Sequence, residues 1–277
     1  MTHTVSVDVP GGRLYGEVDG SGPPLVLVHA GVANLRQWDP HVPSWAERYT
    51  VIRYDTRGYG RSESEHVGFA NRADLAAVLD FVGAPTAHVL GSSRGGQIAL
   101  DFAVDTPERV LSLTSVAGGV GNFEPDLPQA VIDAIVAFDQ ATEALAEAKD
   151  WAQVADLETA YWFDGPGQPA DRADPAVRAM CRDWIFTNYA AEKEPGIPQP
   201  LDPSADTRLD SLTMPVLAVV GDLDEAYAIA AMTYLAGAVP NGRLEVFTGA
   251  AHLLNLEQPE RFTRLVADFL GRVPRPD

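Results

Sequence analysis

The sequence has a single cysteine and a shortage of positive charge. Cys181 cannot form an intramolecular disulfide, and its surroundings "RAMCRDWIF" carry no CxxC or histidine-rich pattern, so we expect a buried, small apolar side chain. There are 20 Lys and Arg against 39 Asp and Glu, which gives a formal net charge of -19. Such a charge repels phosphate backbones and anionic lipid surfaces, and therefore argues against nucleic acid and membrane partners.

Long apolar runs and targeting signals are also missing. No 18 consecutive residues are apolar, and the start "MTHTVSVDVPGG" lacks the basic and apolar regions of a signal peptide. The sequence therefore predicts a cytoplasmic protein. Because it has no H-E-x-x-H motif and no clustered His and Cys spacing, neither a metal nor another cofactor is expected. Nothing in the pattern indicates an oligomeric state.

What is present is the pattern of a soluble α/β protein of 277 residues, long enough to bury one large core. Alternating apolar residues on either side of a Pro-Gly-Gly turn predict a leading antiparallel hairpin over residues 2–19. Continuous apolar runs predict buried strands at 25–30, 51–55, 87–91, 110–118, 214–222 and 242–249. Helical spacing is found at 73–84, 95–107 and 259–273. This alternation predicts a mainly parallel sheet with helices packed on it.

Residues 121–209 break the alternation, because they contain helical patterns at 128–163 and 174–192 but no convincing buried strand. The segment is too long for a plain connection. We therefore expect a helical cap at 121–209, inserted into a core domain formed by 1–120 and 210–277. Most of its aromatic side chains should pack against the core, and a few should line an apolar pocket. The aromatic residues include Trp151, Tyr161, Trp162, Phe163, Trp184, Phe186 and Tyr189.

Residues 91–96 read "GSSRGG" and fit the motif G-x-S-x-G with Ser93 at its centre. The motif follows a predicted buried strand and precedes a predicted helix, which is the context that it requires. Gly91 and Gly95 lack bulk where strand and helix nearly touch, so Ser93 can occupy a tight, strained turn. The helix start also brings free N–H groups beside the Ser93 hydroxyl. Ser92 does not fit, because the residue two positions before it is not glycine.

A serine nucleophile needs a general base, and the base needs an acid that orients it. His252 lies in "FTGAAHLLNLEQPERF", in a loop after the last predicted strand, from which it can reach over the strand ends. Asp222 and Asp224 follow the preceding buried strand, at the edge where open α/β sheets bind ligands. Serine, aspartate and histidine then occur in the chain order of a triad on a doubly wound sheet. His29, at the end of an earlier strand, is expected to hold a loop by hydrogen bonding.

These motifs resemble those of the α/β-hydrolase superfamily over nearly the whole chain. The stretches "VLVHAGVANLRQWD", "VIRYDTRGYGRSE", "GSSRGG", "VVGDLDEAY" and "GAAHLLNLEQPERF" occur in the family's order and approximate spacing. The resemblance implies a mostly parallel eight-stranded sheet flanked by helices, with a helical cap inserted after strand six. It selects Asp224 as the acid, because the family's acid ends a G-x-x-D pattern. Asp222 then becomes a turn-former, and Glu124, just after strand six, remains an alternative acid.

The resemblance also implies an oxyanion hole made by the backbone N–H groups of Gly31 and Arg94. Gly31 follows the pair His29-Ala30, in which Ala30 departs from the family's usual glycine. The Arg94 side chain is expected either to reach the pocket mouth and favour anionic substrates, or to pack against the surface through an ion pair. The family's D-x-R-G-x-G-x-S turn, interpreted as structural, is matched by Asp55, Arg57, Gly58, Gly60 and Ser62.

Together these features predict a serine hydrolase similar to small-molecule esterases and enol-lactone hydrolases. Ser93 would attack the carbonyl of an ester or lactone of a small, apolar or aromatic molecule, His252 would take and return the proton, and Asp224 would fix the imidazole. Carbon-carbon bond hydrolases and cofactor-free perhydrolases share this triad and remain alternatives. A ligand-binding protein with little turnover is a further alternative. A small-molecule substrate is the only partner expected.

Overall fold

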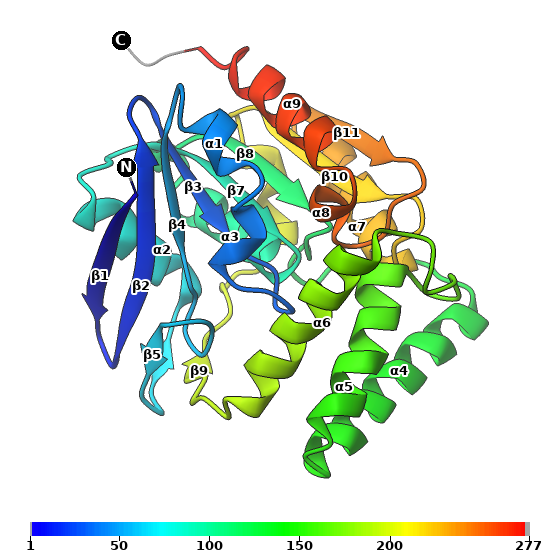
Figure 1. Ribbon diagram of the computed structural model, residues 1–277. Helices are drawn as coiled ribbons and strands as arrows, with labels where there is room; N and C mark the ends of the chain where they lie inside the picture. Colours follow the sequence, from blue (N-terminus) through cyan, green and yellow to red (C-terminus); the bar gives the residue numbers. More distant parts are fainter. Residues whose placement is uncertain (1, 275–277) are drawn as a thin grey trace.

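A computed structural model describes residues 2–274, and its centre is a long twisted sheet (Figure 1). The strands follow the spatial order β1-β2-β4-β3-β7-β8-β10-β11. β1 and β2 form an antiparallel hairpin, β2 pairs antiparallel with β4, and all later pairs along this path are parallel. The eight-stranded, mostly parallel sheet predicted from the sequence is thus confirmed. Its strands are β1 (His3–Val9), β2 (Gly12–Gly20), β3 (Pro24–Val28), β4 (Thr50–Tyr54), β7 (Ala87–Ser92), β8 (Val110–Val116), β10 (Val216–Gly221) and β11 (Gly242–Phe247).

Three two-residue strands lie outside this path. β5 (Glu63–Ser64) pairs with β2, while β6 (Gly68–Phe69) pairs with β9 (Ile197–Pro198). Because β9 lies within residues 121–209, the second pairing connects this segment to the chain before α2.

The central strands are apolar throughout because helices cover both faces of the sheet. On β3, Val26 and Val28 point into one apolar cluster, whereas Leu25 and Leu27 point into another. The first cluster includes side chains of α2 (Asn71–Phe81), α3 (Arg94–Asp105) and α7 (Ala226–Ala238). The second includes side chains of α1 (Val42–Trp45) and α9 (Pro259–Leu270). Successive side chains of a strand point to opposite faces of the sheet. Because helices cover both faces here, the central strands bury apolar side chains on both.

The helices α2, α3 and α9 occur where the sequence predicts them, but α7 was not predicted. Its sequence "AYAIAAMTYLAGA" is apolar on nearly every side, so it lacks the periodic contrast that identifies a helix at a protein surface. Four further helical segments are short: η1 (Leu35–Trp38), η2 (Pro107–Arg109), η4 (Ala205–Ser211) and α8 (Leu254–Glu257). Within residues 2–274, no helix combines the length and apolarity that crossing a bilayer requires.

Residues 121–209 contain α4 (Gln129–Glu147), α5 (Trp151–Glu158), the π-helical segment η3 (Thr159–Asp164) and α6 (Pro175–Ala190). In Figure 1 these green helices stand to one side of the sheet. α5 packs against both α4 and α6, and α4 itself buries no residue. The helices occur in the predicted places. The division of the chain into a core and a cap at residues 121 and 209 remains a prediction.

Candidate active site

The turn between β7 and α3 holds Ser93 in an unusual backbone conformation, with φ 55° and ψ -121°. Such a left-handed φ is costly for a residue with a side chain. The neighbouring glycines explain how the turn closes: a Cβ on Gly91 would lie 2.0 Å from the carbonyl oxygen of Gly95, and a Cβ on Gly95 would lie 2.3 Å from that of Val28. The Ser93 N–H is held by the carbonyl of Val116 at 2.7 Å. Ser92 is fully buried.

His252 lies in the loop between β11 and α8 and is paired with Asp224, which lies just after β10. Its Nδ1 is 2.9 Å from Oδ1 and 3.0 Å from Oδ2 of that carboxylate. Both side chains are almost fully buried. Burial opposes protonation of the imidazole, but the charge and hydrogen bond of Asp224 outweigh it and raise the pKa of His252. Among the described residues Nε2 has no hydrogen-bond partner, so it is free to accept a proton.

The other two candidate acids are placed elsewhere. Asp222 is exposed, and its Oδ1 accepts a hydrogen bond from the N–H of Gly249 at 2.7 Å, which ties the turn after β10 to the loop after β11. Glu124 is also exposed and is not hydrogen-bonded to His252. Asp224 is further oriented by the backbone N–H of Glu225, at 2.8 Å from Oδ1. The carboxylate of Asp224 therefore contacts the imidazole, and those of the other two do not.

Ser93 and His252 line one cavity of about 380 Å³. Residues from the loops after β3 and β4 form one side of it, and residues 158–195 form the other. Trp162 lies against the imidazole, with ring centroids 4.6 Å apart. Of the nine aromatic residues at 121–209, Trp162 and Tyr189 line this cavity. The remaining lining residues are Gly31, Val32, Gly58, Tyr59, Glu158, Ile185, Asn188, Lys193 and Pro195.

The two expected oxyanion-hole donors lie close together. A Cβ on Gly31 would lie 3.8 Å from the Cβ of Arg94, and neither backbone N–H donates a hydrogen bond within the described part of the chain. Arg94 is the first residue of α3, where N–H groups have no intrahelical acceptor. Ala30 does not have a positive φ, so its methyl group replaces a glycine without backbone strain.

His29 fixes the start of this loop as a neutral side chain. Its Nδ1 donates to the carbonyl of Ala30 at 2.7 Å, and its Nε2 accepts from the N–H of Thr56 at 3.1 Å. Complete burial, reinforced by the charge of Arg94, lowers the pKa of His29 to about 3. The imidazole therefore works as a hydrogen-bonding bridge between β3 and β4.

The Arg94 side chain follows neither of the two alternatives considered for it. Its guanidinium donates to Thr56 Oγ1 and lies over the ring of Tyr59, with Cζ 4.5 Å from the centroid. It has no carboxylate partner among residues 2–274, and it does not line the cavity. The positive charge is thus held beneath the loop that carries Gly31.

Sequence reasoning missed Gln37 and Asn255, which connect the Gly31 loop to the segment after His252. Gln37 Oε1 accepts from the N–H of Ala30 at 2.8 Å, and its Nε2 donates to Asn255 Oδ1 at 3.2 Å. Asn255 in turn lies 3.3 Å from His41 Nε2. All three side chains are fully buried. Because the partners are 218 positions apart in sequence, no local pattern indicates the contact.

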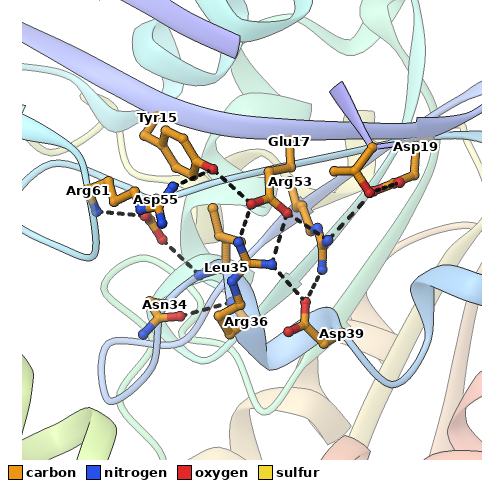
Figure 2. A network of polar contacts seen from close by, with 11 residues as sticks. Tyr15, Glu17, Asp19, Asn34, Leu35, Arg36, Asp39, Arg53, Asp55 and Arg61 are labelled. Carbon is orange, nitrogen blue, oxygen red and sulfur yellow. Dashed lines mark hydrogen bonds and ion pairs between the residues drawn. The ribbon is translucent and has the colours of Figure 1, made fainter. Parts of the chain in front are cut away.

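A polar network fixes the outer end of the same loop (Figure 2). The carboxylate of Asp55 accepts from the N–H of Leu35 at 2.9 Å and from that of Arg61 at 2.8 Å. Next to it, the buried Glu17 on β2 accepts hydrogen bonds from Arg36 and Arg53. The network joins β2, β4 and η1, so it determines where the chain goes after Gly31.

Ion pairs and amide contacts fasten the insertion to the loops of the site. Arg172 pairs with Glu257 at 2.6 Å and donates to the carbonyls of Phe163 and Gly249. On the other side of the cavity, Asn188 donates to the carbonyl of Ala33 at 3.1 Å. The insertion therefore contacts both the His252 loop and the Gly31 loop.

The remaining observations concern the environment of Cys181 and metal binding. Cys181 is buried in an apolar cluster with Phe163 and Leu253, as predicted, and burial raises the pKa of its thiol to about 12. Within residues 2–274, no three or more His, Cys, Asp or Glu side chains are grouped so that they could hold a metal ion.

Comparisons with known proteins give the relationships of this chain. The sequence profile of the family described as alpha/beta hydrolase fold matches residues 23–259. The chain is 29% identical over 260 residues to a pimeloyl-(acyl-carrier protein) methyl ester esterase of Aeromonas hydrophila, which covers 91% of this chain and 97% of that protein. It is 28% identical over 269 residues to a 2-hydroxy-6-oxononadienedioate/2-hydroxy-6-oxononatrienedioate hydrolase of Burkholderia vietnamiensis, with 93% and 90% covered. Carboxylesterases and enol-lactonases occur among the other relatives.

The fold is also similar to a solved structure. A thermophilic esterase from Thermogutta terrifontis superimposes with a TM-score of 0.78. Its sequence is 24% identical, and the match covers 98% of this chain and 99% of that one. At this identity the likeness concerns the fold.

Proposed function

Since the chain belongs to the α/β hydrolase fold family, we propose that it is a serine hydrolase that cleaves a carboxylic ester or lactone of a small, apolar or aromatic molecule. One observation carries this proposal: His252 is held by Asp224, its Nε2 has no partner among the described residues, and it lines the same cavity as Ser93. A base that is held by an acid and shares a cavity with a strained serine is the arrangement that can activate a hydroxyl group.

The reaction proceeds through an acyl-enzyme. His252 Nε2 takes the proton of the Ser93 hydroxyl as its oxygen attacks the substrate carbonyl. The N–H groups of Gly31 and Arg94 hold the negative charge that develops on the carbonyl oxygen. The tetrahedral intermediate then collapses, the bond between the carbonyl carbon and the leaving oxygen breaks, and the imidazolium gives its proton to that oxygen. Water attacks the acyl-enzyme by the same steps, with His252 again acting as the base.

The surroundings of His252 suit both halves of this cycle. Asp224 accepts from Nδ1–H, which leaves Nε2 as the acceptor in the neutral imidazole. The same carboxylate stabilises the imidazolium once the proton has moved. Trp162 packs against the ring at an interplanar angle of 46° and reduces the access of water. The helices of 121–209 thus act as a cap that limits the size of the substrate.

A cavity of about 380 Å³ is at the small end of the range typical of ligand pockets. It therefore favours a small-molecule substrate over a long acyl chain. A carbon-carbon bond hydrolase is a second candidate, because the matched relatives include hydrolases of 2-hydroxy-6-oxononadienedioate. The same triad can catalyse both reactions, so the substrates that the protein cleaves distinguish the two candidates.

The test combines covalent labelling with a substrate panel of p-nitrophenyl esters, lactones and β-diketones of increasing acyl size. We expect a fluorophosphonate to label Ser93, and we expect the substitution Ser93→Ala to abolish labelling and lower ester turnover by at least about 10³-fold. Ser92→Ala is the matched control, because Ser92 is fully buried and its hydroxyl has no partner in residues 2–274. It should keep both labelling and turnover.

Each result has a distinct meaning. Near-parent ester turnover in Ser93→Ala would refute the proposed nucleophile. Cleavage of β-diketones in preference to esters, lost in Ser93→Ala, would establish the carbon-carbon hydrolase instead. Tight binding of panel compounds with neither labelling nor turnover would identify a ligand-binding protein.

A further inference from the structure

Glu158 is a buried carboxyl group in the wall of the cavity and is not a member of the proposed triad. It is the last residue of α5, is 7% exposed, and lines the cavity together with Ser93 and His252. A carboxyl group in such a place is costly unless hydrogen bonds or a cation compensate for lost hydration. The contacts of its two oxygen atoms therefore indicate what the cavity can bind.

One oxygen is satisfied by the protein and the other is not. Oε1 accepts the hydroxyl of Tyr189, a residue of α6, at 2.5 Å. Oε2 has no hydrogen-bond partner among the described residues, and it is not among the unpaired polar atoms that are completely buried. The carboxyl group thus retains an acceptor for a molecule in the cavity.

The protein supplies no cation to this carboxyl group within the described chain. Lys193 lines the same cavity, but its ammonium group donates to the carbonyls of Gly60 and Ser62. Arg94 is held by Thr56 and Tyr59. Burial, opposed by the Tyr189 hydrogen bond, raises the pKa of Glu158 to about 6, so near neutral pH the group is mostly ionised and accepts hydrogen bonds.

We propose that Glu158 determines substrate specificity by binding a hydrogen-bond donor, a protonated amine or a hydroxyl group, on the part of the substrate that faces α5 and α6. This inference rests on the proposed function for the identity of the cavity as a substrate site. A protonated amine forms the stronger, charge-assisted bond. A substrate with a carboxylate in this position would be repelled by Glu158 and would leave Oε2 unpaired.

Binding without turnover tests the inference. The probes are hexylammonium, hexan-1-ol and hexanoate, titrated by calorimetry into Ser93→Ala protein. Hexylammonium and hexanol should bind more tightly than hexanoate. Adding Glu158→Gln should weaken hexylammonium binding by about tenfold to a hundredfold and remove most of this preference, because an amide keeps the shape but not the charge.

Asp156→Asn is the matched control, since this carboxyl group lies on the same helix but is exposed and paired with Arg182. It should leave the order and strength of binding unchanged. Glu158→Asp provides a second variant, which keeps the charge and should retain the preference in weaker form. Equal binding of the three probes, or a preference that survives Glu158→Gln, would overturn the inference.

A kinetic arm separates this inference from the proposed function. For p-nitrophenyl esters whose acyl chains end in an amine, a hydroxyl, a methyl or a carboxylate group, the ratio of kcat/KM between amine and methyl ends should fall about tenfold to a hundredfold in Glu158→Gln. If a fluorophosphonate labels Ser93 but the kcat/KM ratio does not change in Glu158→Gln, the role of Glu158 is refuted and the proposed function stands. If Ser93→Ala retains turnover, the proposed nucleophile fails, while the calorimetric result still decides the role of Glu158.

Discussion

The contact between Gly95 and the end of β3 makes a sharp prediction about the substitution Gly95→Ala. A Cβ at this position would lie 2.3 Å from the carbonyl oxygen of Val28 and 2.6 Å from that of His29. Both atoms belong to backbone, so the start of α3 must move away by on the order of 1 Å. Overpacking of this kind costs about 1–3 kcal/mol of the free energy of unfolding.

The same movement separates the two N–H groups proposed to bind the oxyanion. Arg94 directly precedes Gly95 on the helix that must move, whereas Gly31 follows His29 on the strand side. A displacement of on the order of 1 Å at a reacting centre lowers turnover by about 10²-fold. We therefore expect Gly95→Ala to lose both stability and kcat, with Ser93 and His252 still present.

The assays are urea unfolding, the rate of fluorophosphonate labelling, and turnover of an ester that the parent hydrolyses. Gly237→Ala is the matched control, because a Cβ at Gly237 on α7 would meet nothing within 4 Å. It should change stability by less than about 1 kcal/mol and leave turnover unchanged. A Gly95→Ala protein with parent stability and turnover would refute the view that this close approach positions the site.

Three further predictions concern the base and its supporting contacts. His252 must be neutral to accept a proton, and its pKa is raised above 6.5, so kcat/KM should rise with pH through a midpoint above that value. Asp224→Asn should lower turnover by about 10⁴-fold and move the midpoint to lower pH, because burial lowers the pKa of His252 and the charge of Asp224 raises it; an unchanged midpoint would contradict the role of Asp224. Gln37→Leu leaves the buried N–H of Ala30 without its acceptor and should cost about 1–3 kcal/mol in urea unfolding; an unchanged stability would show that this contact is dispensable.

The sequence predicts best those features whose physical requirement is local. The strands could be placed because burial on both faces makes them continuously apolar, as on β3 and β10. The turn at Ser93 could be recognised because glycine is needed at fixed offsets, where strand and helix backbones meet. α7 escaped prediction for the opposite reason, since a helix that is apolar all round has no periodic contrast.

Contacts between distant segments could not be predicted. Gln37 and Asn255 are ordinary polar residues in sequence, and their function as a bridge exists only once η1 and α8 are packed together. Glu158 belongs to a helical pattern that gives no sign of which residue faces the cavity. The contacts of the Arg94 side chain with Thr56 and Tyr59 were also not predictable, because both residues belong to the turn after β4, which is distant in sequence.

The π-helical segment Thr159–Asp164 has a consequence for how this cavity can change. A π-turn contains one residue more than the α-turn that it replaces. Loss of a single residue before Trp162 would convert the π-turn into an α-turn, and the side chains that follow would keep nearly the same angle around the helix axis. Trp162 would therefore stay near the imidazole of His252, and Phe163 near its apolar cluster. At this point the cap can lose one residue while the wall of the cavity keeps nearly the same shape.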